Sequence, residues 1–93
     1  MKIVLEIGFS FKRELDQGYH WLEIPIETTV YGALEALVER YPQVRGRLFD
    51  ETGGIRRNVN ALINGANVQQ RERFDTVLRP DDRLTILPLI GGG

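Results

Sequence analysis

Residues 29–42 read TVYGALEALVERYP, and this stretch decides the fold that the sequence predicts. Its large apolar residues recur at helical spacing and form one stripe: Val30, Ala33, Leu34, Leu37, Val38 and Tyr41. Thr28 or Thr29 can cap this helix by accepting a hydrogen bond from a free backbone N–H, and Pro42 ends it. If the stripe packs on a sheet, each large apolar side chain contributes about 1.5–3 kcal/mol, and the sum forms most of the core.

Two strands are predicted before the helix. Residues Lys2–Phe9 alternate between apolar side chains at the odd positions and a mixed set at the even ones, which is typical of a half-buried strand. Residues Tyr19–Glu27 read as a second strand, in which Leu22, Ile24 and Ile26 share a face. Pro25 cannot donate a ladder hydrogen bond, so this strand is expected at an edge of the sheet. The pair forms an antiparallel hairpin with a long charged loop.

After the helix, three more strands are predicted. Residues Arg56–Asn64 form one, with Val59, Ala61 and Ile63 opposed to Asn60 and Leu62. Asn64-Gly65 is a tight-turn signal, and a short strand over Ala66–Gln69 follows it. Phe74, Val77 and Leu78 indicate a short buried turn before the last strand, Arg83–Pro88.

This order of elements predicts one α+β domain over residues 1–88. Its mixed sheet has four to five strands and one main helix on one face, with the first and last strands side by side at the centre. That is the β-grasp, or ubiquitin-like, arrangement, and it leaves the other face of the sheet open. Val4, Leu62 and Leu87 are predicted on that open face. Such an apolar patch either binds a partner or is covered by loops.

The chain ends with Leu89-Ile90-Gly91-Gly92-Gly93, which is predicted to be a flexible tail. Glycine has no Cβ, so the tail allows close approach of another backbone, and five extended residues span at most roughly 17 Å. That length suffices to bring the terminal carboxylate into a partner's active site. The carboxylate is inert, so chemistry there needs an activating partner that uses ATP. Glycine-rich ends also fray or remain from cloning linkers, so the tail alone does not decide the function.

Composition excludes several classes of function. There is no cysteine, and His20 and Ser10 are the sole histidine and serine, so disulfides, thiolate sites, histidine-rich metal sites and a Ser-His-acid catalytic set are not expected. The net charge of −1 favours neither nucleic acid nor an anionic membrane, and no apolar run reaches bilayer length. We expect a cytoplasmic protein. Four arginines, at positions 56, 57, 71 and 73, form either a basic rim or an ordinary solvated surface.

The ordered motifs resemble those of the MoaD/ThiS family of ubiquitin-like sulfur carriers, over nearly the whole chain. Four segments carry the resemblance: Phe9-Ser10-Phe11-Lys12-Arg13-Glu14-Leu15, Thr29-Val30-x-x-Ala33-Leu34, Val59-Asn60-x-Leu62-Ile63-Asn64-Gly65 and Asp81-Asp82-x-Leu84-x-Ile86-Leu87-Pro88. The last glycines stand where the family ends in Gly-Gly. Two features depart from the family pattern: Pro80-Asp81-Asp82 replaces its usual Asp-Gly-Asp, and Gly93 is a third glycine.

The resemblance implies a carrier rather than an enzyme, at most the small subunit of a sulfur-transferring synthase such as molybdopterin synthase. A ubiquitin-activating-type adenylyltransferase would use ATP to adenylate Gly93, or Gly92 if the end is trimmed, and sulfur would then give a thiocarboxylate. Leu89, Ile90 and Gly91 would lie in the partner's channel. The carrier itself would bind no cofactor.

The resemblance also implies a downstream partner, either the large subunit of molybdopterin synthase or an enzyme of the cysteine synthase type. The Val59-Asn60 pattern slightly favours archaeal-type or CysO-like members. Two alternatives remain open. One is a ubiquitin-like protein modifier joined to lysine through the same glycine, and the other is a plain β-grasp binding module.

Overall fold

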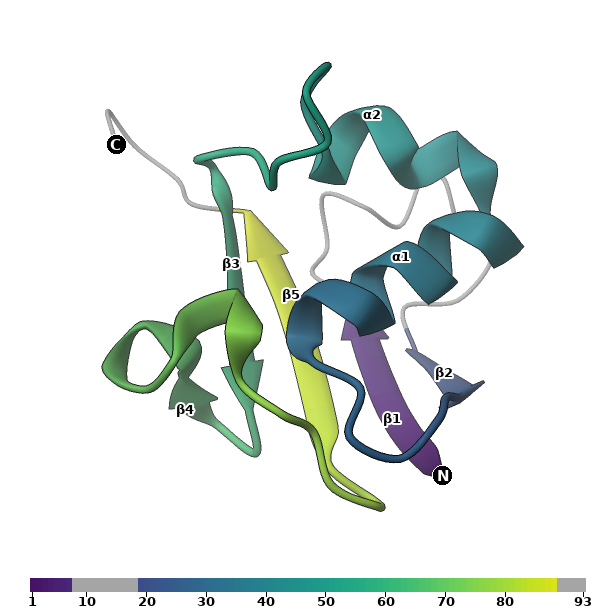
Figure 1. Cartoon of the computed structure of the whole chain (residues 1–93), viewed down its shortest axis with the longest axis vertical. Helices are drawn as coiled ribbons and strands as arrows, with labels where there is room; N and C mark the ends of the chain where they lie inside the picture. Colours follow the sequence, from purple (N-terminus) through teal and green to yellow (C-terminus); the bar gives the residue numbers. More distant parts are fainter. Residues whose placement is uncertain (8–18, 89–93) are drawn as a thin grey trace.

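The computed structural model describes residues 1–7 and 19–88 of the chain (Figure 1). Its larger elements are the strands β1 (Lys2–Ile7), β2 (Tyr19–Glu23), β3 (Val59–Ile63), β4 (Ala66–Asn67) and β5 (Arg83–Pro88), and the helices α1 (Val30–Arg40) and α2 (Arg45–Leu48). Three short 3₁₀ turns complete it: η2 (Pro42–Val44), η3 (Val68–Gln70) and η4 (Arg73–Asp75). The predicted extension of the first strand to Phe9, the charged loop with Ser10, and the tail 89–93 lie outside the described residues.

The five strands form one mixed sheet in the order β2-β1-β5-β3-β4. β1 and β5 pair in parallel at its centre, whereas β1 with β2, β3 with β5 and β3 with β4 are antiparallel. Both helices lie on one face, and α1 crosses the central strands (Figure 1). The predicted α+β arrangement, with first and last strands adjacent, is therefore confirmed.

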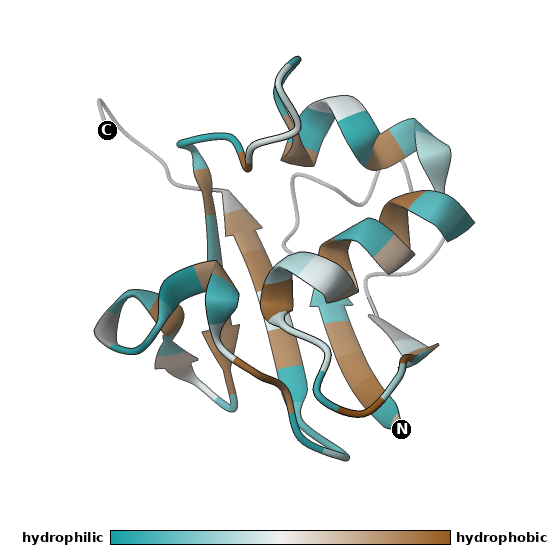
Figure 2. Cartoon of the chain, viewed as in Figure 1, coloured by the Kyte–Doolittle hydropathy of each residue, from teal (hydrophilic) through white to brown (hydrophobic). Residues whose placement is uncertain are grey.

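The core lies between α1 and the sheet. The buried stripe of α1 is Val30, Ala33, Leu34, Leu37 and Val38. It packs on buried apolar residues of the strands, and the ribbons of β1 and β5 are mostly brown in Figure 2, where brown marks hydrophobic residues. Tyr41, the last residue of the predicted stripe, lies just beyond the helix and is half-buried. The stripe predicted from helical spacing thus forms the centre of the core.

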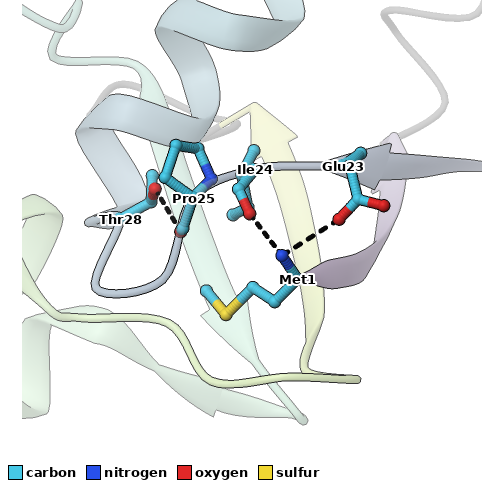
Figure 3. Close-up of polar contacts among 5 residues, drawn as sticks. All are labelled: Met1, Glu23, Ile24, Pro25 and Thr28. Atoms are coloured by element: carbon cyan, nitrogen blue, oxygen red, sulfur yellow. Dashed lines mark hydrogen bonds and ion pairs between the residues drawn. The ribbon is translucent and has the colours of Figure 1, made fainter.

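Thr29, rather than Thr28, caps the helix. The N–H of Gly32 donates to the Thr29 hydroxyl oxygen at 3.1 Å. The Thr28 hydroxyl instead donates to the carbonyl of Pro25 at 2.7 Å, which closes the turn that precedes the helix (Figure 3). Thr28 therefore closes the loop before the helix, and Thr29 caps the first turn of the helix.

The second strand is shorter than predicted. β2 ends at Glu23, and Ile26, expected to share a buried face with Leu22 and Ile24, is 78% exposed. The amino group of Met1 donates to the carbonyl of Ile24 at 2.6 Å and lies 2.9 Å from Oε2 of Glu23, as Figure 3 shows. These contacts hold Ile24 against the end of β1, and the chain then turns away toward α1. The prediction that β2 is an edge strand is correct.

The third strand also starts later than predicted, at Val59 rather than Arg56. The N–H of Arg56 donates to the carbonyl of Leu48 at 2.9 Å, and Nε of Arg56 donates to the carbonyl of Gly46 at 2.7 Å. Arg56 is therefore tied to α2 instead of joining the sheet. Within β3 the predicted alternation holds, and Asn64-Gly65 makes the expected turn with both φ values positive, 52° and 88°.

The short strand after that turn ends at Asn67, because the Asn67 side chain accepts from the N–H of Gln69 at 2.8 Å and starts η3. In the following segment Leu78 is buried and Phe74 is half-buried, as predicted, but Val77 is exposed. Thr76 is buried in its place, and its carbonyl accepts from the N–H of Val30 at 2.9 Å. This backbone contact turns the Val77 side chain away from the core.

Candidate functional site

The open face of the sheet carries the side chains that alternate with the core. Ile3 and Leu5 of β1 and Leu84 and Ile86 of β5 are fully buried under the helices. The residues between them on each strand point the other way, since successive side chains of a strand alternate between faces. The predicted residues Val4, Leu62 and Leu87 all lie on this open face, as expected.

The strand register arranges these residues in three rows. One row runs from Arg83 through Val4 to Trp21, and the next from Leu62 through Thr85 to Glu6. In the third row Leu87 faces Asn60. The three predicted apolar residues therefore share a face but stand in different rows.

These three residues do not form a uniformly exposed apolar patch. Leu62 and Leu87 are half-buried, but Val4 is only 7% exposed, between the exposed side chains of Arg83 and Trp21. Val4 therefore offers almost no surface to a partner. Trp21, which is 52% exposed, is the large apolar side chain of this face that sequence reasoning missed. The signal was available, because Trp21 alternates with Leu22, which was placed in the core.

The middle of the open face is hollowed and polar at its rim. A shallow hollow of about 520 Å³ is lined by Leu62 and Thr85, with Glu6, Arg83 and the turn at Asn64-Gly65 around them. Nη1 of Arg83 lies 3.7 Å from Oε2 of Glu6, and both side chains are largely exposed. Such an exposed ion pair contributes little stability, so it can be broken when a partner docks.

Asn60, which was named from the sequence only as a strand residue and as part of the family motif, is a second feature of this face. It is 7% exposed, and its side-chain oxygen Oδ1 is buried with no hydrogen-bond partner among residues 1–7 and 19–88. An unpaired buried acceptor costs about 1–3 kcal/mol. Asn60 faces Leu87, and its neighbour Val59 pairs with Pro88, where β5 ends. The unpaired oxygen therefore lies beside the base of the tail.

The tail begins at the residue after this last pair. Gly93, Gly92, Gly91, Ile90 and Leu89, the residues expected to react or to enter a partner, lie outside the described residues. β5 is hydrogen-bonded to β1 on one side and to β3 on the other, so the strand that precedes the tail is fixed within the sheet.

The described residues hold no other obvious chemistry. Residues 1–7 and 19–88 contain no group of three His, Cys, Asp or Glu side chains suited to a metal ion, and no helix among them is long and apolar enough to cross a membrane. Asp50 has a lowered pKa because the Thr52 hydroxyl donates to its Oδ1 at 2.6 Å, and the N–H groups of Thr52 and Gly54 also donate to it. These bonds close a surface turn in which Gly53 has φ of 87°, so the role of Asp50 is structural.

Three of the four arginines for which a basic rim and an ordinary solvated surface were the two alternatives lie together. Arg56, Arg57 and Arg73 line a hollow of about 280 Å³ on the helix side of the sheet. Arg71 is exposed but does not line it.

Comparisons with known proteins agree with this architecture. The sequence model of the ThiS family matches residues 9–93. Small archaeal modifier protein 3 of Haloferax volcanii is 27% identical over 93 residues, which cover 100% of both chains. The crystal structure of SAMP1 from the same organism matches all of both chains with a TM-score of 0.87 at 22% identity.

A structure of the BexX/CysO complex of Amycolatopsis orientalis also contains a similar chain. It has a TM-score of 0.76 at 23% identity and covers 98% of this chain and 99% of that one. At these identities the two solved structures establish the ubiquitin-like β-grasp fold. The match to the family's sequence model covers most of the chain, and on that basis the protein belongs to the ThiS family.

Proposed function

We propose that this protein is a sulfur carrier whose terminal glycine, Gly93, is adenylated and converted to a thiocarboxylate. The observation that carries the proposal is the position of β5. This central strand of a ThiS-family domain is paired on both sides and leads directly into Leu-Ile-Gly-Gly-Gly. A firmly held strand followed by unhindered glycines suits the delivery of a chain end into another protein's active site.

The chemistry follows from the inertness of a carboxylate. An oxygen of the Gly93 carboxylate attacks the α-phosphorus of ATP, and pyrophosphate leaves. The resulting acyl adenylate is electrophilic at its carbonyl carbon, so a sulfide equivalent supplied by the sulfur donor attacks there and AMP leaves. The carrier contributes the acyl group and a docking face, while the ubiquitin-activating-type partner contributes the catalytic groups. The product would serve a synthase in molybdopterin or cysteine formation.

The proposed docking face is the open face of the sheet, around Leu62, Leu87 and Trp21. These half-buried or exposed apolar side chains are flanked by polar ones, as in interfaces that form and dissociate. Val4 stays in this face only as support for Trp21 and Arg83, because it is almost fully covered.

The experiment that tests the function is the intact mass of the protein after incubation with its activating enzyme, ATP and a sulfur donor. The expected result is a gain that corresponds to one oxygen replaced by sulfur, located in the C-terminal fragment. That fragment also identifies Gly92 or Gly93 as the acyl site. A variant without the three glycines should show no gain. An unchanged wild-type mass, with the enzyme active on another carrier, would contradict the proposal.

A second experiment tests the docking face. Leu62→Asp places a charge among the apolar residues and is expected to raise the KM of the activating enzyme for the carrier about ten-fold, equivalent to about 1.4 kcal/mol. Ile26→Asp is the matched control, because Ile26 is exposed outside the open face. Equal KM values for a folded Leu62→Asp protein and the wild type would remove the open face from the proposal.

A protein modifier is the second candidate, and one observation favours it: the relative that matches over its full length is named a modifier protein. In that case the ε-amine of a lysine attacks the same acyl group, and an isopeptide bond forms. Covalent adducts of the protein on lysines of other proteins in cells would identify this function. Cells that contain the thiocarboxylate but no such adducts would exclude it.

A further inference from the structure

The helix side of the molecule carries two hollows of opposite charge, one on each side of Tyr31. Tyr31 lines both of them. Among the described residues, the larger, of about 520 Å³, is lined by four carboxylates, those of Glu35, Glu39, Asp50 and Glu51, and by one cation, Arg45. The smaller, of about 280 Å³, has Arg56, Arg57 and Arg73 around it, and no carboxylate of residues 1–7 or 19–88 lines it. We call this smaller hollow the arginine hollow.

Two of the three arginines have no partner within the part of the chain that the structure describes. Arg56 is partly satisfied, since its Nε donates to the carbonyl of Gly46 and its charge acts on the nearby Asp50. Arg57 and Arg73 are exposed and make no side-chain hydrogen bond or ion pair with described residues. Glu72 and Asp75 flank Arg73 in the sequence, but neither lines the hollow. Asp50 is the one carboxylate given beside them, in a neighbouring hollow that it lines with Arg56 and Arg57, so among the described residues the three guanidinium charges outnumber it. An anionic group placed in the arginine hollow would therefore be attracted.

The floor of the arginine hollow is apolar. Tyr31, Ile55 and Phe74 line it, and all three are partly buried against the core. The Tyr31 hydroxyl is already used, because it donates to the carbonyl of Gly53 at 2.6 Å. The hollow therefore offers an aromatic and aliphatic floor below a guanidinium rim, and Gln69 adds an amide beside it. Tyr, Phe and Arg are the residues enriched at the energetic centres of protein interfaces.

We propose that the arginine hollow binds an acidic segment of another protein, with an apolar side chain on its floor and carboxylates on Arg57 and Arg73. A guanidinium and a carboxylate match in planar geometry and form paired hydrogen bonds. The volume suits one or two side chains and is below the range of ordinary small-molecule pockets. A nucleic acid would need a longer basic track than these three residues provide, and the chain as a whole has a net charge of −1.

The hollow also lies next to the base of the tail. Val59, one of its lining residues, pairs with Pro88, the last residue of β5. A protein that takes up the tail would therefore bring its own surface close to the arginine hollow. This placement of the segment rests on the proposed function, whereas the binding of an acidic segment does not.

The test is a titration of the uniformly ¹⁵N-labelled protein, followed by the backbone resonances of Val59, Gln69 and Phe74 and the Nε–H resonances of the arginines. The probe is a short capped peptide of alternating Glu and Leu. Its control is the same peptide with Gln in place of Glu, and inorganic phosphate is the third ligand. The Glu peptide is expected to shift the resonances of the hollow selectively. The Gln peptide and phosphate should leave them largely unchanged.

Variants assign the effect to individual charges. The double variant Arg57→Gln, Arg73→Gln should raise the Kd of the Glu peptide at least about five-fold, because two exposed charge pairs are lost. Arg71→Gln removes the same kind of charge from the same segment but outside the hollow, and should change the Kd less than about two-fold. All three positions are exposed, so the variants keep the core intact.

Several results would overturn the proposal. Shifts spread evenly over all arginines would show nonspecific attraction, and equal shifts with phosphate would show a site for a free oxyanion. An unchanged Kd in the double variant would remove Arg57 and Arg73 from binding. None of these results depends on the thiocarboxylate assay, so a failure here is separate from a failure of the proposed function.

Discussion

The two faces of the sheet are made by the same strands but follow different rules. Under the helices, Ile3, Leu5, Ala61, Leu84 and Ile86 have no exposed surface at all. On the open face, the residues between them are a mixture of apolar, polar and charged types, and one is a buried asparagine whose Oδ1 has no partner among the residues that the structure describes. Stability therefore comes mainly from one face, which leaves the composition of the other free to serve recognition.

This difference predicts that the same Leu→Ala truncation lowers the free energy of unfolding more in the core than on the open face. The largest effect is expected in α1. Leu34→Ala removes a fully buried side chain from the core and should lower the free energy of unfolding by about 2–5 kcal/mol. Leu62→Ala makes the same truncation on the open face, where the side chain is half-buried, and should cost about 1 kcal/mol. Urea unfolding of both variants measures the contrast. Equal costs would mean that the open face is a second core.

A change in the opposite direction is expected at Asn60. Asn60→Leu replaces a buried amide, whose Oδ1 has no hydrogen-bond partner in the described part of the chain, by an apolar side chain of similar size, and should raise the free energy of unfolding by about 1 kcal/mol. Asn58→Leu, at an exposed position of the preceding loop, is the control and should change stability little. If Asn60→Leu instead destabilises the protein, the amide is hydrogen-bonded to water in solution. The free-energy cost assigned here to its buried oxygen would then be wrong.

Asp81 lies in a turn outside both faces of the sheet, and a substitution there is expected to change stability less than the substitutions above. Its φ is 67°, in the left-handed region that favours glycine, and this is the position where the family motif has glycine. Asp81→Gly should therefore stabilise the protein by about 0.5–1 kcal/mol, seen as a higher Tm. Asp75→Gly is the matched control at an exposed position without positive φ, and it should destabilise. A lower Tm for Asp81→Gly would contradict this account of the turn.

The smallest effect concerns acid. The hydroxyl of Thr52, followed by the N–H groups of Thr52 and Gly54, holds the pKa of Asp50 below its ordinary value. Because the folded pKa lies below the unfolded one, the contribution of Asp50 to stability is present above about pH 4 and is lost as the pH falls through the folded pKa. Asp50→Asn should therefore reduce the slope of stability against pH in that window. A slope unaffected by Asp50→Asn would assign acid sensitivity elsewhere.

Local patterns predicted most of the helix-covered face. The 3.6-residue stripe of α1 and the period-two alternation of β1 and β3 are properties of single segments, so the sequence was sufficient to place Leu34 and Ala61 in the core. The Asn64-Gly65 turn was predictable for the same reason. Contacts between segments were not predictable, and they set the late start of β3, where Arg56 is tied to α2.

The open face depended more on such contacts. Alternation put Val4 on the correct face, but its burial results from Arg83 and Trp21, which the register brings from the two neighbouring strands. The arginine hollow likewise gathers side chains from α1, the loop before β3 and η4. Arg73 lines the hollow and Arg71 does not, although they are two residues apart, because the chain turns into η4 at Arg73. The roles given to residues 89–93 remain predictions.

The parallel pairing of β1 with β5 has a consequence for how the protein is made. The central pair joins the first strand of the chain to the last one, so loop closure over nearly the whole chain must precede completion of the sheet. On the ribosome, β1, β2 and α1 emerge early but lack their central partner until β5 has been synthesised. A chain that stops short of β5 cannot complete its core. Because residues 89–93 are synthesised after β5, every chain that contains them also contains the strand that completes the sheet.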